Sequence, residues 1–273
     1  FNGFGNGSTH ANTTSALTAG GTPLGWSLIN NVTLNASALT WVGGTTGVMI
    51  NGTLAVNAAG ETTLNTAANG VISGKIDAAG KTLVKIGGQT LFLTNGDTGA
   101  GANAVGAWKL MAGTTEVRLS NGASNPLGAS APITLNGATL VISHEGDNTA
   151  NMQVLSTFAN NNLTISSTAT LGGGSYIGSG GTALNLTRAG SGSNKTVQFG
   201  TLAFGGPLGS PLLTLNNVAD NQQLSNSFTG LSFIKDAQIT NNSRGGGNGN
   251  VTINGPISGN GTLLKSGGGG LYI

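Results

Sequence analysis

Two segments far apart in the chain carry the same pattern, and a chain that repeats itself in this way has few folds open to it. Residues 72–93 read ISGKIDAAGKTLVKIGGQTLFL, and residues 253–273 read INGPISGNGTLLKSGGGGLYI. With one residue of slack, both follow I-x-G-x-I-x-x-x-G-(T)-L-x-K-x-G-G-x-x-L-x-I/L. Such a unit cannot bury its apolar positions alone and needs stacked neighbours. The repeat therefore predicts a solenoid.

The local pattern is that of short β-strands. Apolar and polar residues alternate with a period of two over runs of about five residues, each bounded by Asn, Gly or Pro. These runs are residues 31–35, 52–57, 132–136, 162–166 and 250–254. Strands this brief suit one face of a β-helical coil. Residues 151–158 are the one stretch with a hint of helical spacing, and they are short enough to be a loop or a single turn.

Asn-Gly dipeptides punctuate the strands. They occur at Asn6, Asn51, Asn69, Asn95, Asn121, Asn136, Asn254 and Asn260, each followed by Gly. Asn-Gly accommodates positive φ at tight turns. In hairpins the dipeptide would join antiparallel strands, whereas in a β-helix it would turn the chain between the faces of one coil. The internal repeat favours the second interpretation.

The composition excludes a disordered chain. Only 7% of the residues are charged, against about 25% in an ordinary globular domain. Disordered chains combine low hydrophobicity with high net charge, but this chain has 37% hydrophobic residues and a mean hydropathy of +0.10. Aromatic residues make up only 5%. A solenoid needs few of them, because Leu, Ile, Val and Ala fill its narrow core.

Charge and cysteine content exclude other classes. The net charge is +2, and the densest basic group, Lys75, Lys81 and Lys85, lies in a strand-and-turn segment rather than on a basic face. We therefore expect no nucleic-acid partner. The chain has no Cys, which excludes thiolate metal sites and suits passage through an oxidising compartment. No apolar run is long enough for a membrane-spanning helix.

The repeat resembles a known family, the autotransporter-associated β-strand repeat. Its motif, I-x-G-x-G-x-L-x-K-x-G-x-G-x-L-x-L, is similar to residues 257–273, and the copy at residues 72–93 departs from it at Ala78 and Ala79. Residues 111–128 resemble the element that follows the motif in such passenger domains, and residues 132–142 resemble the next strand pair. These stretches cover about a third of the chain.

The resemblance implies an all-β fold, a right-handed parallel β-helix, exported to the outer surface of a bacterium or beyond. We expect residues 1–273 to form a single solenoid segment of a longer chain, with residues 1–45 as an N-terminal capping region. With about 20–25 residues per coil, eleven to thirteen coils would make a rod of roughly 50–60 Å, since parallel strands lie about 4.8 Å apart.

Acidic residues offer little for catalysis. Only His144, Glu145 and Asp147 form a cluster of ionisable groups. They fit either a general acid or weak metal site, or a solvated loop after the strand, and turn residues Gly146 and Asn148 favour the loop. His10 has no neighbouring ligand in the sequence. We expect no catalytic, cofactor-binding or metal-binding residue.

Other site motifs are incomplete. Residues 172–181 have the glycines of a calcium β-roll without its Asp, and residues 95–99 offer too few oxygen ligands. No Gly-rich loop precedes a Lys-Ser/Thr helix start, and no G-x-S-x-G precedes a helix. The Gly/Asn/Ser-rich stretches 188–195 and 241–250 are either partner contacts or excursions from the solenoid. Asn31 and Asn162 head N-x-T triplets inside expected strands.

The three Trp residues admit two interpretations. If exposed, Trp26, Trp41 and Trp108 would be natural platforms for sugar rings. Alternatively they plug or cap the solenoid, a role that the position of Trp26 and Trp41 near the N-terminus favours.

The leading functional hypothesis is structural: a rigid spacer or filament-forming segment of an adhesin-like surface protein, not an enzyme. The alternatives are a glycan-binding module, a polysaccharide-degrading enzyme and an ice-binding surface. An ice-binding surface would need regular Thr-x-Thr rows, which the sequence does not display. Residues 267–273 carry no charge and no Pro, so we expect end-to-end continuation, through further coils of the polypeptide or a neighbouring molecule.

Overall fold

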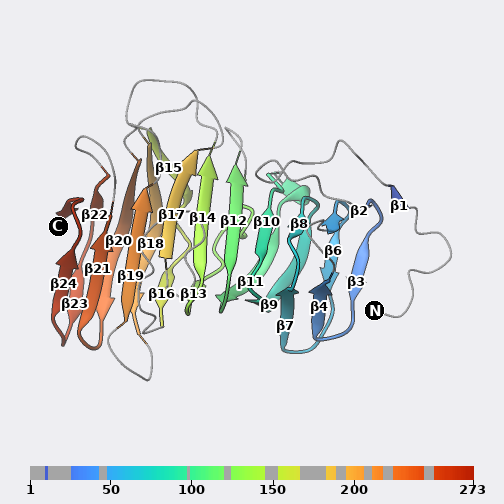
Figure 1. Cartoon of the computed structure of the whole chain (residues 1–273), viewed down its shortest axis with the longest axis horizontal. Coiled ribbons are helices and arrows are strands. Elements are labelled where there is room, and N and C mark those ends of the chain that lie inside the picture. The colour runs from blue at the N-terminus through green and yellow to red at the C-terminus, as the bar shows by residue number, and fades with distance from the viewer. Residues whose placement is uncertain are drawn as a thin grey trace.

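The protein is a stack of parallel β-strands. The computed structural model describes residues 10–11, 26–42, 48–96, 99–119, 124–144, 153–166, 183–188, 195–205, 211–217, 224–242 and 249–273. Within them, β1 and β2 form the one antiparallel pair, all other strand pairs are parallel, and the one helical element is a 3-10 turn at Gly99–Gly101. The strands lie side by side along an elongated body, in chain order from blue to red (Figure 1). The expected all-β solenoid is confirmed, and its right-handed sense stays a prediction.

The first sheet holds one strand from each coil. Its eleven strands are, in spatial order, β1 (His10–Ala11), β2 (Trp26–Leu28), β5 (Val48–Ile50), β8 (Gly70–Ile72), β10 (Thr90–Leu93), β12 (Thr114–Leu119), β14 (Thr139–His144), β17 (Ala183–Arg188), β19 (Leu212–Asn217), β21 (Ala237–Asn241) and β24 (Leu263–Ser266).

The second sheet has fourteen strands in two arms. The first arm contains β3 (Val32–Leu34), β6 (Leu54–Val56), β15 (Gln153–Phe158), β22 (Val251–Ile253) and β25 (Leu271–Tyr272). The second arm contains β4 (Ala38–Trp41), β7 (Glu61–Thr66), β13 (Ile133–Leu135), β16 (Leu163–Ile165) and β23 (Ile257–Gly259). Four longer strands run through both arms: β9 (Ile76–Ile86), β11 (Ala104–Leu110), β18 (Lys195–Phe204) and β20 (Leu224–Phe233).

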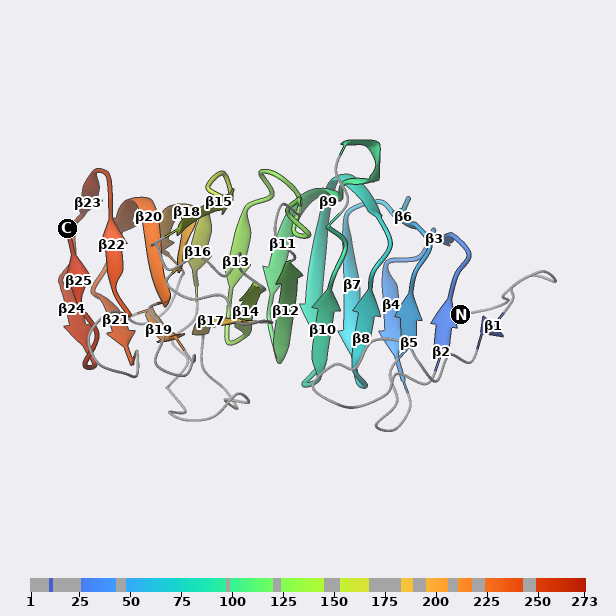
Figure 2. The same cartoon turned by 90° about the horizontal axis from the view of Figure 1, so that it is seen from above.

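One coil therefore visits three faces: the first sheet, the first arm and the second arm. Figure 2 shows the strands of the two sheets on opposite sides of the body. Val48 pairs with Gly70, 22 residues later, and Gly70 pairs with Leu91, 21 residues later. These steps match the expected coil length. Ten parallel strands of the first sheet are stacked in the described residues, fewer than the expected eleven to thirteen coils, because Thr139 pairs with Ala183, 44 residues on.

Inward side chains form continuous columns along the axis. In the second arm, residues in register from coil to coil give the column Leu39, Leu64, Lys85, Leu110, Leu135, Ile165, Phe204 and Phe233. In the first arm, the rings of Phe158, Phe199 and Phe228 stack, with centroids 5.4 and 5.9 Å apart. Burial of these columns holds neighbouring coils together, since each coil packs only on the coils beside it.

The five short strands predicted from the sequence are all present, as β3, β6, β13, β16 and β22. The helical hint at residues 151–158 is wrong, because residues 153–158 form β15, which pairs with β18. Its Phe158 belongs to the aromatic stack, so packing overrides the local spacing.

Most of the described Asn-Gly dipeptides do not have a Gly with positive φ. Among the described ones, only Gly137 has a left-handed backbone, with φ of 75°. Gly52, Gly70, Gly255 and Gly261 lie close against the preceding coil instead. A Cβ on Gly52 would collide with the backbone of Asn30, and a Cβ on Gly70 would lie 2.8 Å from the Trp41 ring. The expectation of positive φ is wrong at these positions, and the missing Cβ is what the packing requires.

Candidate functional site

Lys85 is the one cation among the fully buried side chains of the described residues. It occupies an inward position in β9, in register between Leu64 and Leu110, and has no exposed surface. Its Nζ donates to the carbonyl oxygens of Gly87 at 2.9 Å, Gln89 at 2.7 Å and Ala112 at 2.7 Å. Three acceptors satisfy the three donors of an ammonium. Desolvation by burial lowers the pKa of Lys85 to about 8.

The corner around Lys85 depends on glycine. Gly87 and Gly113, in successive coils, have φ of 85° and 62°, in the left-handed region. A Cβ on Gly113 would lie 2.6 Å from the Lys85 Nζ and closer still to the Gly87 oxygen. Thr66, one coil earlier, completes the corner, because its Oγ1 bonds to the Ile86 oxygen at 3.1 Å and the Gln89 oxygen at 2.9 Å. The corner thus joins three coils by polar contacts.

The second copy of the sequence repeat forms the same local unit. Lys265 lies in register with inward Ile239, and its Nζ donates to the Gly267 oxygen at 2.5 Å, where φ is 81°. However, Lys85 ends the second arm before the first sheet, whereas Lys265 ends a strand of the first sheet before the first arm. The repeat therefore encodes a strand–corner–strand unit that is used at two different corners, not a whole coil in phase.

Buried asparagines link the coils in the middle of the body. Asn95 donates to Asn103 Oδ1 at 2.7 Å, and Asn103 also accepts from the Ile76 amide and donates to the Pro126 oxygen. Asn125 donates to Asn161 Oδ1 at 2.5 Å. Asn161, with no exposed surface, donates to the oxygens of Gly128 and Ala131. These amides satisfy corner backbone groups that the strands leave unpaired.

Two of the three Trp side chains are internal. Trp41 is 3% exposed and donates from its indole to the Val48 oxygen, at 3.1 Å. Trp108 has no exposed surface and donates to the Leu127 oxygen, at 2.9 Å. Neither can stack against a sugar ring at the surface. Trp26 lies in β2, and its side chain is outside the described residues.

The acidic cluster lies almost wholly outside the described residues. His144 ends β14, and Glu145 and Asp147 follow it beyond the described part. The candidate stretches 172–181, most of 188–195 and most of 241–250 also lie outside it, as does Asp97. His10 is in β1. The part that the structure describes contains no group of three or more His, Cys, Asp or Glu that could hold a metal.

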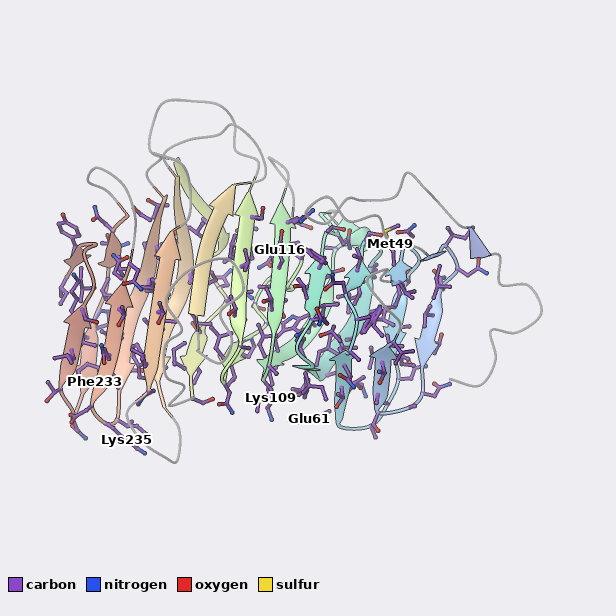
Figure 3. All side chains as sticks on the ribbon, viewed as in Figure 1. Met49, Glu61, Lys109, Glu116, Phe233 and Lys235 are labelled. Carbon is purple, nitrogen blue, oxygen red and sulfur yellow. The ribbon has the colours of Figure 1, made fainter. Side chains whose placement is uncertain are left out.

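Three of the described carboxylates, those of Glu61, Glu116 and Asp236, have hydrogen-bonding partners. Glu61 and Lys109 are close to each other across the second arm and form an ion pair (Figure 3). Arg118 Nε lies 2.6 Å from Glu116, and the Arg118 guanidinium lies 4.9 Å from the Phe92 ring centroid. Asp236 accepts from the Thr262 amide at 2.7 Å, across one coil. The contacts Glu61–Lys109 and Asp236–Thr262 link different coils, whereas Glu116 and Arg118 pair within one strand, β12.

A row of hydroxyls escaped the sequence analysis. Residues in register along the first sheet are Thr90, Thr114, Thr139, Ala183, Thr214, Thr240 and Ser266. Thr240 and Ser266 exchange a hydrogen bond of 2.7 Å. Thr139, Thr214 and Thr240 are buried, at 5%, 2% and 6% exposure. Unequal coil lengths hide this row along the chain. It contains buried hydroxyls and an Ala, so it is not the Thr-x-Thr row that an ice-binding surface would need.

Comparisons with known proteins give no relative for this arrangement. A scan against protein-family models finds no match, and searches of curated proteins and of solved structures find none either. Among the described residues, no helix is both long and apolar enough to cross a membrane. The corners and inward columns are therefore interpreted from their own geometry.

Proposed function

We propose that this chain is a rigid spacer segment of an adhesin-like protein on the outer surface of a bacterium, of the kind built from autotransporter-associated β-strand repeats. Its work is mechanical: it holds other parts of the protein at a distance. The observation that carries the proposal is that hydrogen bonds and apolar side-chain columns link each coil to the next. The clearest case is the corner where Lys85, Thr66 and Ala112 join three coils.

Several features of the solenoid support mechanical rigidity. Parallel ladder bonds run along all three faces. The inward columns place Leu, Ile and Phe over one another from coil to coil. Buried Asn95, Asn103, Asn125 and Asn161 fix the corners by hydrogen bonds rather than by flexible turns. The absence of Cys suits export through an oxidising compartment.

The proposal assigns no catalytic residue to the chain. Glu61, Lys109, Glu116 and Arg118 form ion pairs, and Lys85 is bound to the carbonyl oxygens of its corner. Burial of Trp41 and Trp108 also removes two of the platforms on which glycan binding was expected to depend. A reducing-sugar assay on neutral and acidic polysaccharides should give no product with this chain, and reproducible product would contradict the assignment.

We further propose that the rod continues end to end, through more coils of the polypeptide or a neighbouring molecule. Support comes from the coil of β23, β24 and β25, where Ile257, Leu264 and Tyr272 are 38%, 55% and 56% exposed. Mass spectrometry and electron microscopy of the native material test this. Rods longer than this chain alone could form are expected, and a compact, non-associating species of the same length would contradict it.

The location is tested on cells. Antibodies raised against the folded chain should label intact cells that express its gene, without permeabilisation. Labelling that appears only after permeabilisation would overturn the proposed surface location, even if the fold and its rigidity stand.

A further inference from the structure

Asn-Gly dipeptides carry a chemistry of their own, apart from any role in folding. The backbone nitrogen of the Gly can attack the Asn side-chain carbonyl carbon. Ammonia leaves and a cyclic succinimide forms, and water then opens the ring to Asp or isoaspartate. Gly offers no Cβ to hinder the attack. The reaction needs an Asn side chain that can rotate and a Gly nitrogen that is not held elsewhere, so the fold decides which dipeptides react.

Three dipeptides are held by their surroundings. Asn51 Oδ1 accepts from the Ser73 hydroxyl, and the Gly52 amide donates to the Leu28 oxygen at 3.3 Å. Asn69 Oδ1 accepts from the Thr90 amide at 3.0 Å. Asn95, 3% exposed, donates to the Gly101 oxygen and to Asn103.

A fourth dipeptide is partly held. Asn136 is half-buried, and its partner Gly137 has a positive φ and is engaged in an interaction of its own. We expect it to react more slowly than a free dipeptide.

Two dipeptides are free. Asn254 and Asn260 are exposed, at the corners that flank β23. Their own amides are anchored, to the Phe228 oxygen at 2.8 Å and the Phe233 oxygen at 3.2 Å. Among the described residues, their side chains and the amides of Gly255 and Gly261 have no hydrogen-bond partner.

We propose that Asn254 and Asn260 are sites of spontaneous deamidation in the folded chain, ahead of the other described Asn-Gly dipeptides. Each conversion adds one negative charge. The formal net charge is +2, so conversion of both brings it to zero, where association between molecules is favoured. Isoaspartate also adds a methylene to the main chain at a corner, which loosens the strand pairing of β23.

The test is peptide mapping by mass spectrometry after incubation of the folded chain in mildly alkaline buffer. Asn254 and Asn260 should gain Asp and isoaspartate first, while Asn51, Asn69 and Asn95 stay intact. In denaturant all five should react at similar rates, because each precedes Gly. Equal rates in the folded chain, or earliest conversion at Asn51, would overturn the proposal.

A variant supplies the matched control. Ser73→Ala removes the hydroxyl that holds Asn51 Oδ1 and leaves the longer bond, 3.3 Å, from the Gly52 amide to the Leu28 oxygen. Conversion at Asn51 should therefore rise part of the way towards that at Asn254, while conversion at Asn69 stays low. If Asn51 remains as protected as before, hydrogen bonds to the Asn side chain do not control the reaction, and the assignment of Asn254 and Asn260 fails with them.

Discussion

The ammonium of Lys85 donates to the carbonyl oxygen of Ala112, 2.7 Å away and one coil further along the chain. A cation is thus placed at an inward position of an apolar column, where backbone carbonyl groups rather than a carboxylate stabilise it by accepting its hydrogen bonds. Burial of an unpaired charge is costly unless it is fully hydrogen-bonded. The corner therefore fixes the position of one coil against the next. Removing the Lys85 ammonium should change the free energy of unfolding by a measurable amount.

Lys85→Met should destabilise the fold. Met fits the apolar column between Leu64 and Leu110, but the oxygens of Gly87 and Ala112 lose their Lys85 donor. Buried acceptors without a donor cost about 1–3 kcal/mol each, offset in part by relief of the buried charge, so we expect a loss of about 2 kcal/mol. Urea unfolding measures it. Lys265→Met, at the exposed copy of the corner, is the control and should change the unfolding free energy little.

Stability should rise with pH on the alkaline side because of Lys85. Its folded pKa is lowered to about 8 by burial, whereas an unfolded Lys has a pKa of about 10.4. Between these values the unfolded chain binds the proton more tightly, so the free energy of unfolding increases as pH rises. The difference in unfolding free energy between the wild type and Lys85→Met should grow in that window. A difference that stays constant from pH 7 to 10 would contradict this.

Gly113→Ala should be far more harmful than Gly60→Ala or Gly88→Ala. Gly113 has φ of 62°, and an added Cβ would meet the Lys85 Nζ and the Gly87 oxygen. Gly60 has φ of 78° with nothing within 4 Å of an added Cβ, so Gly60→Ala isolates the backbone strain, about 1–2 kcal/mol. Gly88→Ala meets nothing either and has no positive φ, so it should be neutral or slightly stabilising. Thermal unfolding of the three variants should rank them in this order.

Thr115→Val should stabilise the protein. Thr115 has no exposed surface, lies in register between Leu91 and Leu140, and its hydroxyl has no partner among the described residues. Replacing it by a methyl group removes an unsatisfied hydroxyl from an apolar column, a gain of about 1 kcal/mol. Thr66→Val is the matched control and should destabilise, because that hydroxyl bonds to two corner oxygens. Chemical denaturation that places both variants on the same side of the wild type would refute the explanation.

Features that depend on only a few consecutive residues, such as short strands, could be predicted from the sequence. The strand at residues 132–136 could be found because alternation and flanking residues define it, and β13 lies there. The Thr row from Thr90 to Ser266 could not, because its members come together only through coil lengths that range from 24 to 44 residues between paired strands. The role of Lys85 was missed for the same reason: its third acceptor, Ala112, belongs to the next coil.

The repeat was found, but its phase was not. Residues 72–93 and 253–273 share the Lys-x-Gly corner, yet they begin on different faces. A corner places the same demands on sequence wherever it occurs, namely an inward residue, a Gly with positive φ and a following strand. Sequence similarity therefore identifies the corner but does not say which of the three faces of the coil precedes it. The expected N-terminal cap at residues 1–45 lies in large part outside the described residues and stays a prediction.

The most direct test of the proposed rigidity is to pull the chain by its two ends in a single-molecule force experiment, which measures how the coils resist unfolding. Coils that contact only their neighbours should unfold in a series of steps, each releasing one coil. A coil of 22 residues, such as that from Val48 to Gly70, releases about 70–80 Å of extended chain. Repeated steps of that size at appreciable force are predicted. Smooth extension at low force, without steps, would contradict the account of this chain as a rigid spacer.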